Sequence, residues 1–152
     1  MKIITQNKKA FHDYDILEKY ETGIVLKGDE VKSLRAGHVQ LVGAFGSIHN
    51  NELFLINCQI SPYSHAYQKL EEMVKRSRKL LVSRKELNRI MMEVAKKGVT
   101  LVPLKLYFNQ KGLVKVELAL CKHKKAHQRK EDIKERDIAR ETRRELRGKY
   151  NA

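Results

Sequence analysis

Few residues in this chain have the types and spacing needed to bind a metal ion or to carry out a reaction. His123 and His127 are four residues apart, a spacing that brings two imidazoles to one face of a helix. Lys124 and Lys125 lie between them and would repel a cation, and no third ligand is close in sequence. The adjacent acids Asp29–Glu30 fit the first turn of a helix, where the helix dipole favours negative charge. We therefore expect no metal site and no cofactor.

Motifs of catalysis are equally scarce. The sequence contains no nucleophile elbow, no phosphate-cradling glycine loop and no H-E-x-x-H zinc motif. A catalytic site assembled by folding leaves no linear trace, so an RNA-processing enzyme stays among the alternatives. We nevertheless expect a protein that is not an enzyme.

The two cysteines favour packing over chemistry. Cys58 and Cys121 both lie inside apolar, strand-like runs, where a free thiol behaves as a small hydrophobic side chain. Reduced, buried residues are the simplest interpretation, with a disulfide between them as the alternative.

The charge of the chain indicates a polyanionic partner. It carries 32 Lys and Arg against 18 Asp and Glu, a formal net charge of +14. RNA, DNA and an anionic membrane all satisfy this excess. A membrane is disfavoured because no apolar run approaches about 18 residues, which leaves nucleic acid. The first fifteen residues show no apolar signal-peptide block, so we expect a cytoplasmic protein.

Basic residues recur in or beside the expected strands and are interleaved with aromatic ones. Such a set is typical of a surface that neutralises phosphates and stacks bases. For any single residue, an ordinary solvated charge or a core aromatic is at least as probable, and only the set favours RNA. The basic members are Lys8, Lys9, Lys27, Lys32, Arg35, Arg78, Lys79, Lys105 and Lys115, and the aromatic members are Tyr14, Tyr20, Tyr107 and Phe108.

One amphipathic helix must help to position these residues. Ser83 and Glu86 make a capping box, and Gly98 supplies a left-handed stop. Between them the apolar positions follow the helical spacing i, i+3, i+4, i+7 and i+8, at Leu87, Ile90, Met91, Val94 and Ala95. The spacing predicts a helix over residues 83–98 whose apolar stripe lies on a sheet.

Two hairpins supply most of that sheet. Strands over 100–108 and 113–121 flank a turn at 109–112, and the alternation in the second arm predicts one buried face and one wet face. A second hairpin follows from residues 44–60, where Asn50 and Asn51 tolerate the positive φ angles of a tight turn.

The remaining segments are shorter. Residues 14–17, 23–28 and 79–82 resemble strands, and residues 28–37 resemble a short helix ended by Gly37. Pro62 lacks an amide hydrogen and closes the strand that ends at Ile60, so residues 61–78 form a connector with a possible short helix near 67–74.

About six short antiparallel strands with one good helix predict a mainly β domain over residues 1–121. The expected fold is a small Greek-key barrel of the oligonucleotide-binding (OB) type, with one to three helices. A split α+β sheet packed by the helix is the alternative.

Residues 122–152 form a basic tail with twelve Lys and Arg, six Asp and Glu, and few apolar residues. Ordering a residue costs about 1–2 kcal/mol, which so little apolar surface cannot offset. Acid–base pairs three or four residues apart, such as Asp132 and Arg136, modestly favour a helix. We expect a tail that is disordered alone and helical along an anionic groove.

Taken together, the sequence resembles the small protein B (SmpB), or SsrA-binding protein, family, which partners bacterial transfer-messenger RNA. The similar stretches cover most of the chain in the family's order, and the second and fifth of them are highly specific. They are "NKKAFHDYDI" (7–16), "ETGIVLKGDEVKSLRAG" (21–37), "FLINCQISPY" (54–63), "RKLL" (78–81), "GVTLVPLKLYFNQKGLVKVELAL" (98–120) and "KKAHQRKEDIKERD" (124–137).

The resemblance implies an OB-like barrel, a tail disordered in solution, and a monomeric, non-enzymatic adaptor in trans-translation. In this role the barrel holds the tRNA-like domain of transfer-messenger RNA. The tail would enter the decoding centre and the empty message channel of the small ribosomal subunit. A stably integrated ribosomal protein is the competing structural hypothesis.

The resemblance also implies site residues. Glu21, Leu81 and Lys115 fall at positions associated with the tRNA-like domain, and His127 matches a histidine that faces the decoding centre. The expected RNA-binding residues are Asn7, Lys8, Lys9, His12, Tyr14, Glu21, Lys32, Arg35, Arg78, Lys79, Leu81 and Lys115. The expected ribosome-facing residues are Lys124, Lys125, His127, Arg129, Lys130, Lys134 and Arg136.

Three departures from the family pattern stand out. Gln128-Arg129-Lys130 replaces a common Asp-Lys-Arg run, which keeps the positive charge and loses the acid. Gly43-Ala44-Phe45 stands where Asp-Ser-Tyr is frequent, so we do not expect a hydroxyl-mediated contact there. Residues 64–77 also lack the usual Asp-Pro-rich character.

Overall fold

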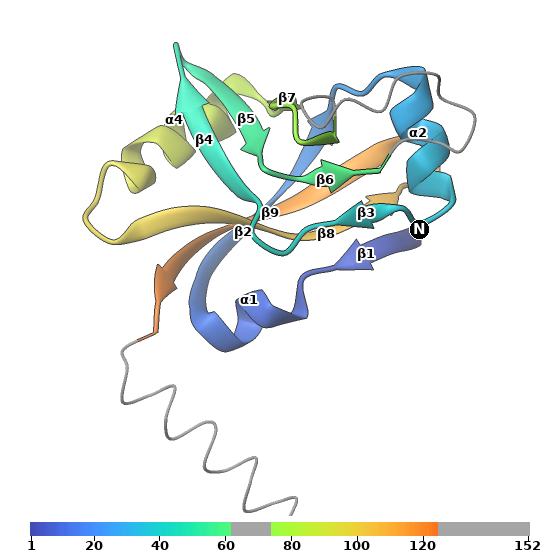
Figure 1. The fold of residues 1–152 in the computed structure, drawn as a ribbon. Helices are drawn as coiled ribbons and strands as arrows, with labels where there is room; N and C mark the ends of the chain where they lie inside the picture. The colour runs from blue at the N-terminus through green and yellow to red at the C-terminus, as the bar shows by residue number, and fades with distance from the viewer. Residues whose placement is uncertain (62–73, 125–152) are drawn as a thin grey trace, which may run out of the picture.

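The computed structural model describes residues 1–61 and 74–124, and these residues fold around one antiparallel β-barrel (Figure 1). The helices in the described residues are α1 (Lys8–Asp13), α2 (Gly28–Arg35) and α4 (Arg84–Val94). The strands are β1 (Lys2–Gln6), β2 (Tyr14–Ile24), β3 (Val39–Gln40), β4 (Phe45–His49), β5 (Glu52–Ile56), β6 (Gln59–Ile60), β7 (Arg78–Leu81), β8 (Val99–Phe108) and β9 (Val114–His123).

Strand pairing closes the sheet on itself. The order β1-β8-β4-β5-β7-β2-β9 is completed by a long pairing of β9 with β8, while β3 and β6 form a separate two-stranded ribbon. Every pairing is antiparallel, so no strand requires a helical crossover. The predicted OB-like barrel is confirmed, and closure between β8 and β9 excludes the split sheet.

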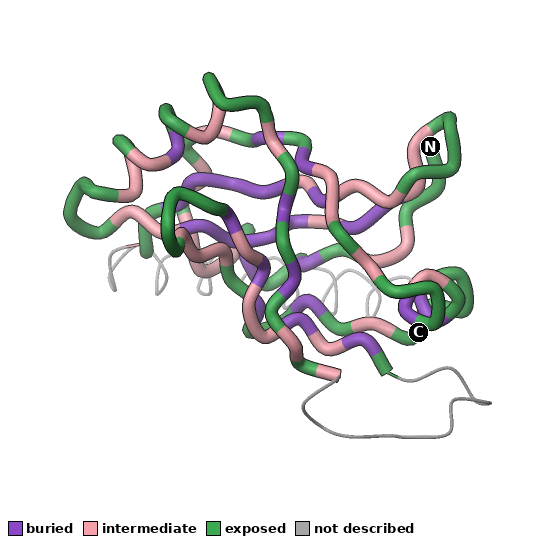
Figure 2. The backbone as a smooth tube through the Cα atoms, turned by 90° about the horizontal axis from the view of Figure 1, so that it is seen from above, coloured by how far each residue is buried: buried purple, intermediate pink, exposed green. Residues whose placement is uncertain are grey.

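The barrel interior holds the main hydrophobic core, to which α4 contributes Ile90. Figure 2 shows buried residues along the middle of the strands and exposed ones at their ends and turns. On β9, Val116 and Leu118 point into this core, as their alternation predicts.

The opposite face of β9 is wet along only part of its length. Ala119 and Cys121 are fully buried in a second cluster with Ala10 of α1 and with Val102 and Leu104 of β8. The prediction of one wet face is therefore wrong at this end of the strand, because α1 covers the outside of the sheet there.

The predicted turns match the backbone. Asn50 and Asn51 have φ angles of 51° and 60° in the two-residue loop between β4 and β5, which suits the twist of a hairpin. In the β8–β9 turn, Asn109 Oδ1 accepts hydrogen bonds from the amides of Lys111 and Leu113, and Gly112 has a φ of 77°. Both hairpins are confirmed, but the hairpin of β4 and β5 ends at Ile56 rather than Ile60, since residues 59–60 pair with β3 instead.

Helix α4 begins as predicted and ends earlier. Ser83 is its N-cap and accepts a hydrogen bond from the Glu86 amide at 3.2 Å. The helix ends at Val94, so Gly98, with a φ of 83°, lies in the turn before β8. Helix α2 also forms as predicted, with Gly37 just beyond it at a φ of 78°.

The N-terminal third differs most from the prediction. Residues 14–24 form one strand rather than two pieces, with a bulge between Ile16 and Glu18 that interrupts the alternation. Strands β1 and β3 and helix α1 are not predicted, because elements of two to six residues are too short to show a period. Strand β7 lies one residue earlier than predicted.

Both cysteines are free and fully buried, as predicted. Cys58 belongs to the barrel core and Cys121 to the cluster under α1, which leaves no basis for the disulfide alternative. Burial raises the pKa of both thiols to about 11. The predicted tail begins too early, because Lys122 and His123 are the last two residues of β9. The rest of the tail, from residue 125, and all but the last residue of the predicted helix near 67–74 lie outside the described residues.

Candidate nucleic-acid interface

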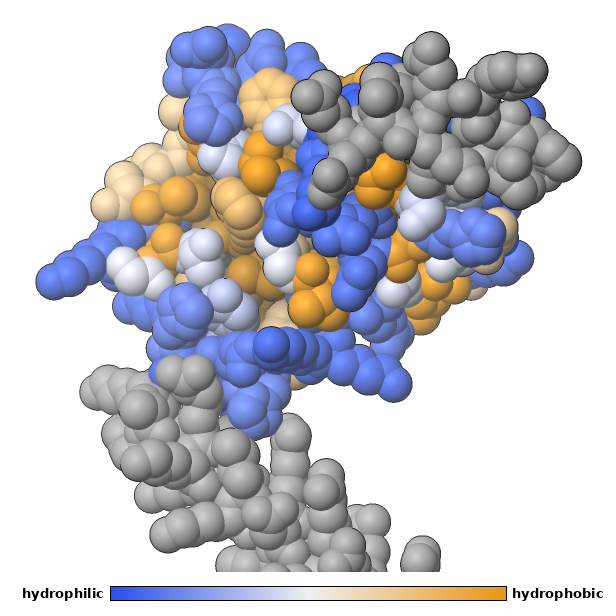
Figure 3. Space-filling model, viewed as in Figure 1, coloured by the Kyte–Doolittle hydropathy of each residue, from blue (hydrophilic) through white to orange (hydrophobic). Residues whose placement is uncertain are grey.

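The first candidate surface lies where β9 ends beside α1. Tyr14 opens β2 opposite His123, and their rings are tilted with centroids 4.5 Å apart. The Lys124 amide donates a hydrogen bond to the Asp13 carbonyl at 3.1 Å. The chain therefore leaves the barrel next to α1, at the lower edge of Figure 3, where hydrophilic side chains gather.

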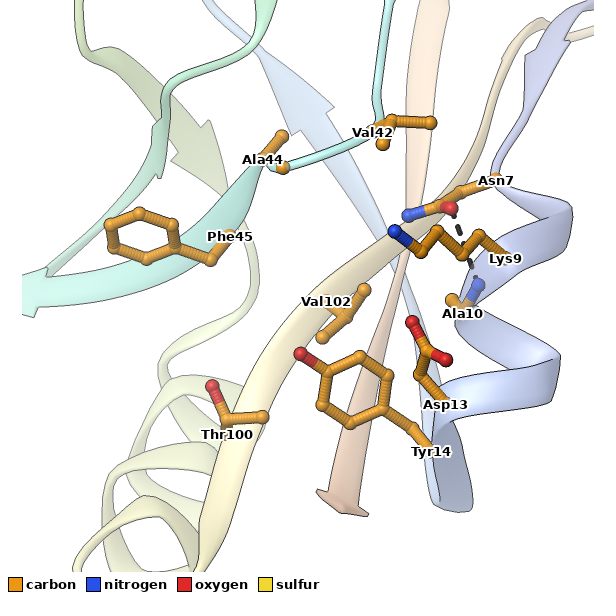
Figure 4. Close-up of a pocket in the computed structure, with 11 residues that line it drawn as sticks. Asn7, Lys9, Ala10, Asp13, Tyr14, Val42, Ala44, Phe45, Thr100 and Val102 are labelled. Atoms are coloured by element: carbon orange, nitrogen blue, oxygen red, sulfur yellow. Dashed lines mark hydrogen bonds between the residues drawn. The ribbon is translucent and has the colours of Figure 1, made fainter. Parts of the chain in front are cut away.

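A pocket of about 400 Å³ opens at this end of the barrel. Figure 4 shows Tyr14 and Phe45 on different sides of the pocket, with Val102 of β8 between them and with Lys9 and Asp13 on the α1 side. Phe45 is 43% exposed. Aromatic walls beside a cation are the features that hold unstacked bases and phosphates.

Asn7 builds the wall of this pocket. Its Oδ1 accepts a hydrogen bond from the Ala10 amide and so caps α1, and its Nδ2 donates to the Pro103 carbonyl. Pro103 has no amide hydrogen and lies in β8 between the residues that pair with β4 and with β1. Asn7 thus seals a gap in the ladder. Only 5% of the Asn7 surface is exposed, so Asn7 has a structural role instead of the predicted direct contact with RNA.

The second candidate surface is centred on Gly23. This residue pairs with Leu81 of β7 on one side and with Lys115 of β9 on the other. A Cβ at Gly23 would lie 3.3 Å from the Leu81 Cβ and 3.7 Å from the Lys115 Nζ. The glycine therefore lets two distant side chains approach across β2. Glu21 lies two residues before Gly23 on β2, and so it is on the same face of the strand. Strand pairing thus brings Glu21, Leu81 and Lys115 to one surface.

A cleft of about 290 Å³ adjoins this surface, with an apolar floor and a cation at its edge. Val31 of α2 and Leu81 of β7 form two of its walls, and Leu81 and Leu113 are 50% and 55% exposed. Exposed leucines beside the Lys115 amine suit a sugar–phosphate backbone, which presents both apolar and anionic atoms. The nearby Glu21 carboxylate would instead accept a hydrogen bond from a ribose hydroxyl.

Charges around this surface are partly balanced. Glu117 lies 3.7 Å from the Lys19 amine and 3.3 Å from the Lys105 amine. Burial, followed by the nearby Glu21 carboxylate, raises the pKa of Tyr107 to about 12, so its phenol stays protonated at neutral pH.

Most of the predicted cations are exposed. Lys8 and Lys9 lie on α1, Lys32 and Arg35 on the last turn of α2, and Lys79 on β7. Lys79 pairs with Glu52 at 3.5 Å, an exposed contact that holds it weakly.

The prediction that Arg78 binds RNA directly is wrong. Its side chain is fully buried, and its Nε donates to the Glu30 carboxylate at 2.6 Å, so it offers no surface to a phosphate. The stacking role suggested for Tyr20 and Tyr107 is also wrong, because both are buried, at 7% and 6% exposure. The alternation of polar and apolar residues along a strand does not show whether an aromatic residue with polar neighbours faces the core or the solvent.

The pocket residues Phe45, Thr100 and Val102 and the central Gly23 escaped prediction. Thr100 and Val102 belong to a strand that was predicted correctly, and no local signal marks which of its residues line a pocket. Among the ribosome-facing residues, Lys124 is described and half-buried. The others lie outside the described residues and stay predictions: Lys125, His127, Arg129, Lys130, Lys134 and Arg136.

Within residues 1–61 and 74–124, no group of three or more His, Cys, Asp or Glu side chains could hold a metal ion. No helix in this described part is long and apolar enough to span a membrane. His12 lies 3.0 Å from the Asp13 carboxylate, and His123 lies against Tyr14.

Comparison with known proteins places this geometry in context. The SsrA-binding protein of Symbiobacterium thermophilum is 52% identical over 148 residues, which cover 97% of this chain and 93% of the relative. The SsrA-binding protein of Carboxydothermus hydrogenoformans is 50% identical over 149 residues, which cover 98% and 99%.

A solved structure described as "tmRNA-SmpB: a journey to the center of the bacterial ribosome" contains a similar chain. It is 50% identical, and the TM-score is 0.67 over 80% of this chain and 85% of that one. The family model described as "SmpB protein" matches residues 4–148. This chain belongs to the SmpB family.

Proposed function

We propose that this protein is an RNA-binding adaptor of trans-translation. It binds the tRNA-like domain of transfer-messenger RNA and delivers that RNA to stalled ribosomes, so that incomplete proteins are tagged and the ribosome is released. Membership of the SmpB family and the likeness to a chain in a tmRNA–SmpB structure support this function.

The observation that carries the proposal is the separation of two surfaces along one ladder. The β2–β9 pairing runs from Tyr14 opposite His123 to Gly23 opposite Lys115. A strand advances by about 3.3 Å per residue, so the eight residues from Lys115 to His123 separate the two surfaces by roughly 26 Å. One rigid element can therefore hold one RNA at each end.

The two ends suit different tasks. The Glu21, Leu81 and Lys115 surface holds the tRNA-like domain, and the α1 surface faces the decoding site of the small ribosomal subunit. The basic tail starts at the α1 surface, since Lys124 is hydrogen-bonded to Asp13. We place the domain boundary at the end of β9, after His123, rather than between residues 121 and 122, because Lys122 and His123 pair with β2. The residues after Lys124 then enter the message channel.

An empty message channel offers a physical test for a stalled ribosome. A segment with twelve cations and six acids gains phosphate contacts only where no message occupies the channel. These contacts offset the cost of ordering the segment, which we expect to become helical there.

The proposal includes three further statements. The protein acts as a monomer in the cytoplasm, it is not an enzyme, and it needs no cofactor. Its RNA-binding residues are Lys8, Lys9, His12, Tyr14, Glu21, Lys32, Arg35, Lys79, Leu81 and Lys115, without Arg78 and with Asn7 in a supporting role.

The test compares the full chain with a chain that ends at Lys124, which keeps β9 and its contact with Asp13. Calorimetry with the tRNA-like domain should give similar dissociation constants for both. Peptide tagging on ribosomes stalled at the end of a message should be lost in the shortened chain. Failure of the shortened chain to bind the RNA would contradict the division of tasks.

A further inference from the structure

The fully buried Arg78 lies at the junction of three segments. Its Nη1 donates to the Cys58 carbonyl at 2.7 Å, and its Nη2 donates to the Val74 carbonyl at 3.1 Å. Cys58 precedes β6 and Val74 precedes β7, so one guanidinium holds the chain on both sides of residues 62–73. Arginine is the only side chain that can donate to both carbonyls and to a carboxylate at once, because its planar guanidinium has five N–H donors in fixed directions.

The same guanidinium is joined to α2 through Glu30. Arg78 Nε lies 2.6 Å from Glu30 Oε2, and Arg76 donates two further hydrogen bonds to this carboxylate. Glu30 Oε1 also accepts the Lys27 amide at 2.9 Å, which caps the first turn of α2. The position of the α2 N-terminus relative to β7 is thus set by the buried ion pair of Glu30 and Arg78, which the more exposed Arg76 reinforces.

Both elements border the RNA surface. Val31, next to Glu30, and Leu81, three residues after Arg78, are walls of the apolar cleft beside Lys115. Leu34 anchors α2 in the core but lies one turn further along, so it does not fix the N-terminal turn by itself. The Arg78–Glu30 contact therefore sets the distance between two walls that RNA would touch.

We propose that Arg78 and Glu30 are positioning residues for RNA binding, which hold α2 and β7 at the separation that the cleft needs without either side chain touching RNA. This inference rests on the proposed function and adds to it an internal pair that controls affinity. It also explains why a basic residue is useful at position 78, where the sequence suggested a phosphate contact.

The test measures binding of the full chain to the tRNA-like domain of transfer-messenger RNA over a range of salt concentrations. The variants are Arg78→Lys, which keeps the charge and loses the fork, and Glu30→Gln, which keeps the shape and loses the charge. Circular dichroism fixes a temperature at which each variant is folded. Lys115→Ala is the control for a direct phosphate contact.

We expect Arg78→Lys and Glu30→Gln each to weaken binding by about tenfold. In a plot of log affinity against log salt concentration, both variants should have the same slope as the wild type, because the number of phosphate contacts is unchanged. Lys115→Ala should instead reduce this slope by about one. Hydrogen exchange should become faster in residues 28–35 and 78–81 of Glu30→Gln and stay unchanged in β8 and β9.

Three results would overturn the inference. Wild-type affinity in either folded variant would mean that the pair does not set the cleft. Tighter binding by Glu30→Gln would mean that Arg78, once released, contacts RNA directly. A smaller salt slope in Arg78→Lys would also indicate direct contact. Failure of the wild-type chain to bind this RNA would count against the proposed function instead.

Discussion

At the scale of single residues, burial decides what a charge can do. Glu30 and Arg78 carry full charges inside the protein, where each requires a partner. Burial opposes ionisation of the Glu30 carboxyl, but hydrogen bonds from Arg76, the Lys27 amide and Arg78 together outweigh it and hold the pKa of Glu30 below its ordinary value. The pair is therefore ionised at neutral pH and costly to break.

Replacing Arg78 with Met should lower the free energy of unfolding at pH 7 by about 3–5 kcal/mol, since it leaves a buried carboxylate short of partners. A carboxyl whose pKa is depressed on folding contributes stability above its unfolded pKa and loses it as the pH falls through its folded pKa. The deficit should therefore shrink below about pH 4.5, the ordinary value for this group. Urea denaturation at pH 7 and at acidic pH measures both effects.

The matched control is Lys79→Met, one residue further along β7. Its amine is exposed and pairs with Glu52 at the surface, so the loss should be below about 1 kcal/mol. An equal cost for Arg78→Met and Lys79→Met at pH 7 would contradict the account of the buried pair.

At the scale of elements, the barrel depends on a few close approaches between strands. Strands β4 and β8 are paired through Gly46 and Leu101. A Cβ at Gly46 would lie 2.7 Å from the Leu101 Cβ, which is closer than two such atoms can pack. The absence of a side chain at Gly46 thus allows β4 and β8 to pair beside the pocket that Tyr14, Phe45 and Val102 line.

Gly46→Ala should lower the free energy of unfolding by about 1–3 kcal/mol, because the extra methyl group pushes β4 away from β8. Thermal unfolding followed by circular dichroism measures the change. Ser47→Ala, on the next residue of β4, removes only a hydroxyl that contacts His49 and should leave the melting temperature nearly unchanged. A normal melting temperature for Gly46→Ala would show that the two strands separate without cost.

At the scale of the whole molecule, one stiff ladder connects two surfaces that carry different tasks. The β2 and β9 strands are long and continuous, whereas each surface is completed by short elements, α1 at one end and β7 with α2 at the other. In Figure 1, α1 and α2 lie at different ends of the barrel. Changes at the two surfaces should therefore act independently.

Tyr14→Ala should reduce peptide tagging on stalled ribosomes without changing affinity for the tRNA-like domain, because its ring lies at the tail end of the ladder. Lys115→Ala should weaken that affinity. In a chain with both changes, the free-energy effects on tagging should add within about 0.5 kcal/mol. Calorimetry and a tagging assay on the three variants measure this, and strong coupling would indicate that the two surfaces are one.

Several features of the fold follow from local sequence. The asparagines at 50 and 51 accept positive φ, Ser83 caps a helix with a clear period, and apolar and polar residues alternate from Val114 to Leu118 in β9. Each of these signals acts between neighbours in the chain, so the sequence predicted the hairpins, the helix and the barrel class. The charge excess likewise indicated a polyanionic partner.

Other features depend on contacts between distant residues. The exposed or buried state of Arg78, Tyr20 and Tyr107 depends on which elements cover them, and no local pattern records that. The site residues Glu21, Leu81 and Lys115 were named by resemblance, but only strand register brings them around Gly23. By itself, therefore, the sequence determined the local elements and the net charge. The tertiary structure decided which side chains share a surface, because closing the barrel fixes neighbours that lie far apart along the chain.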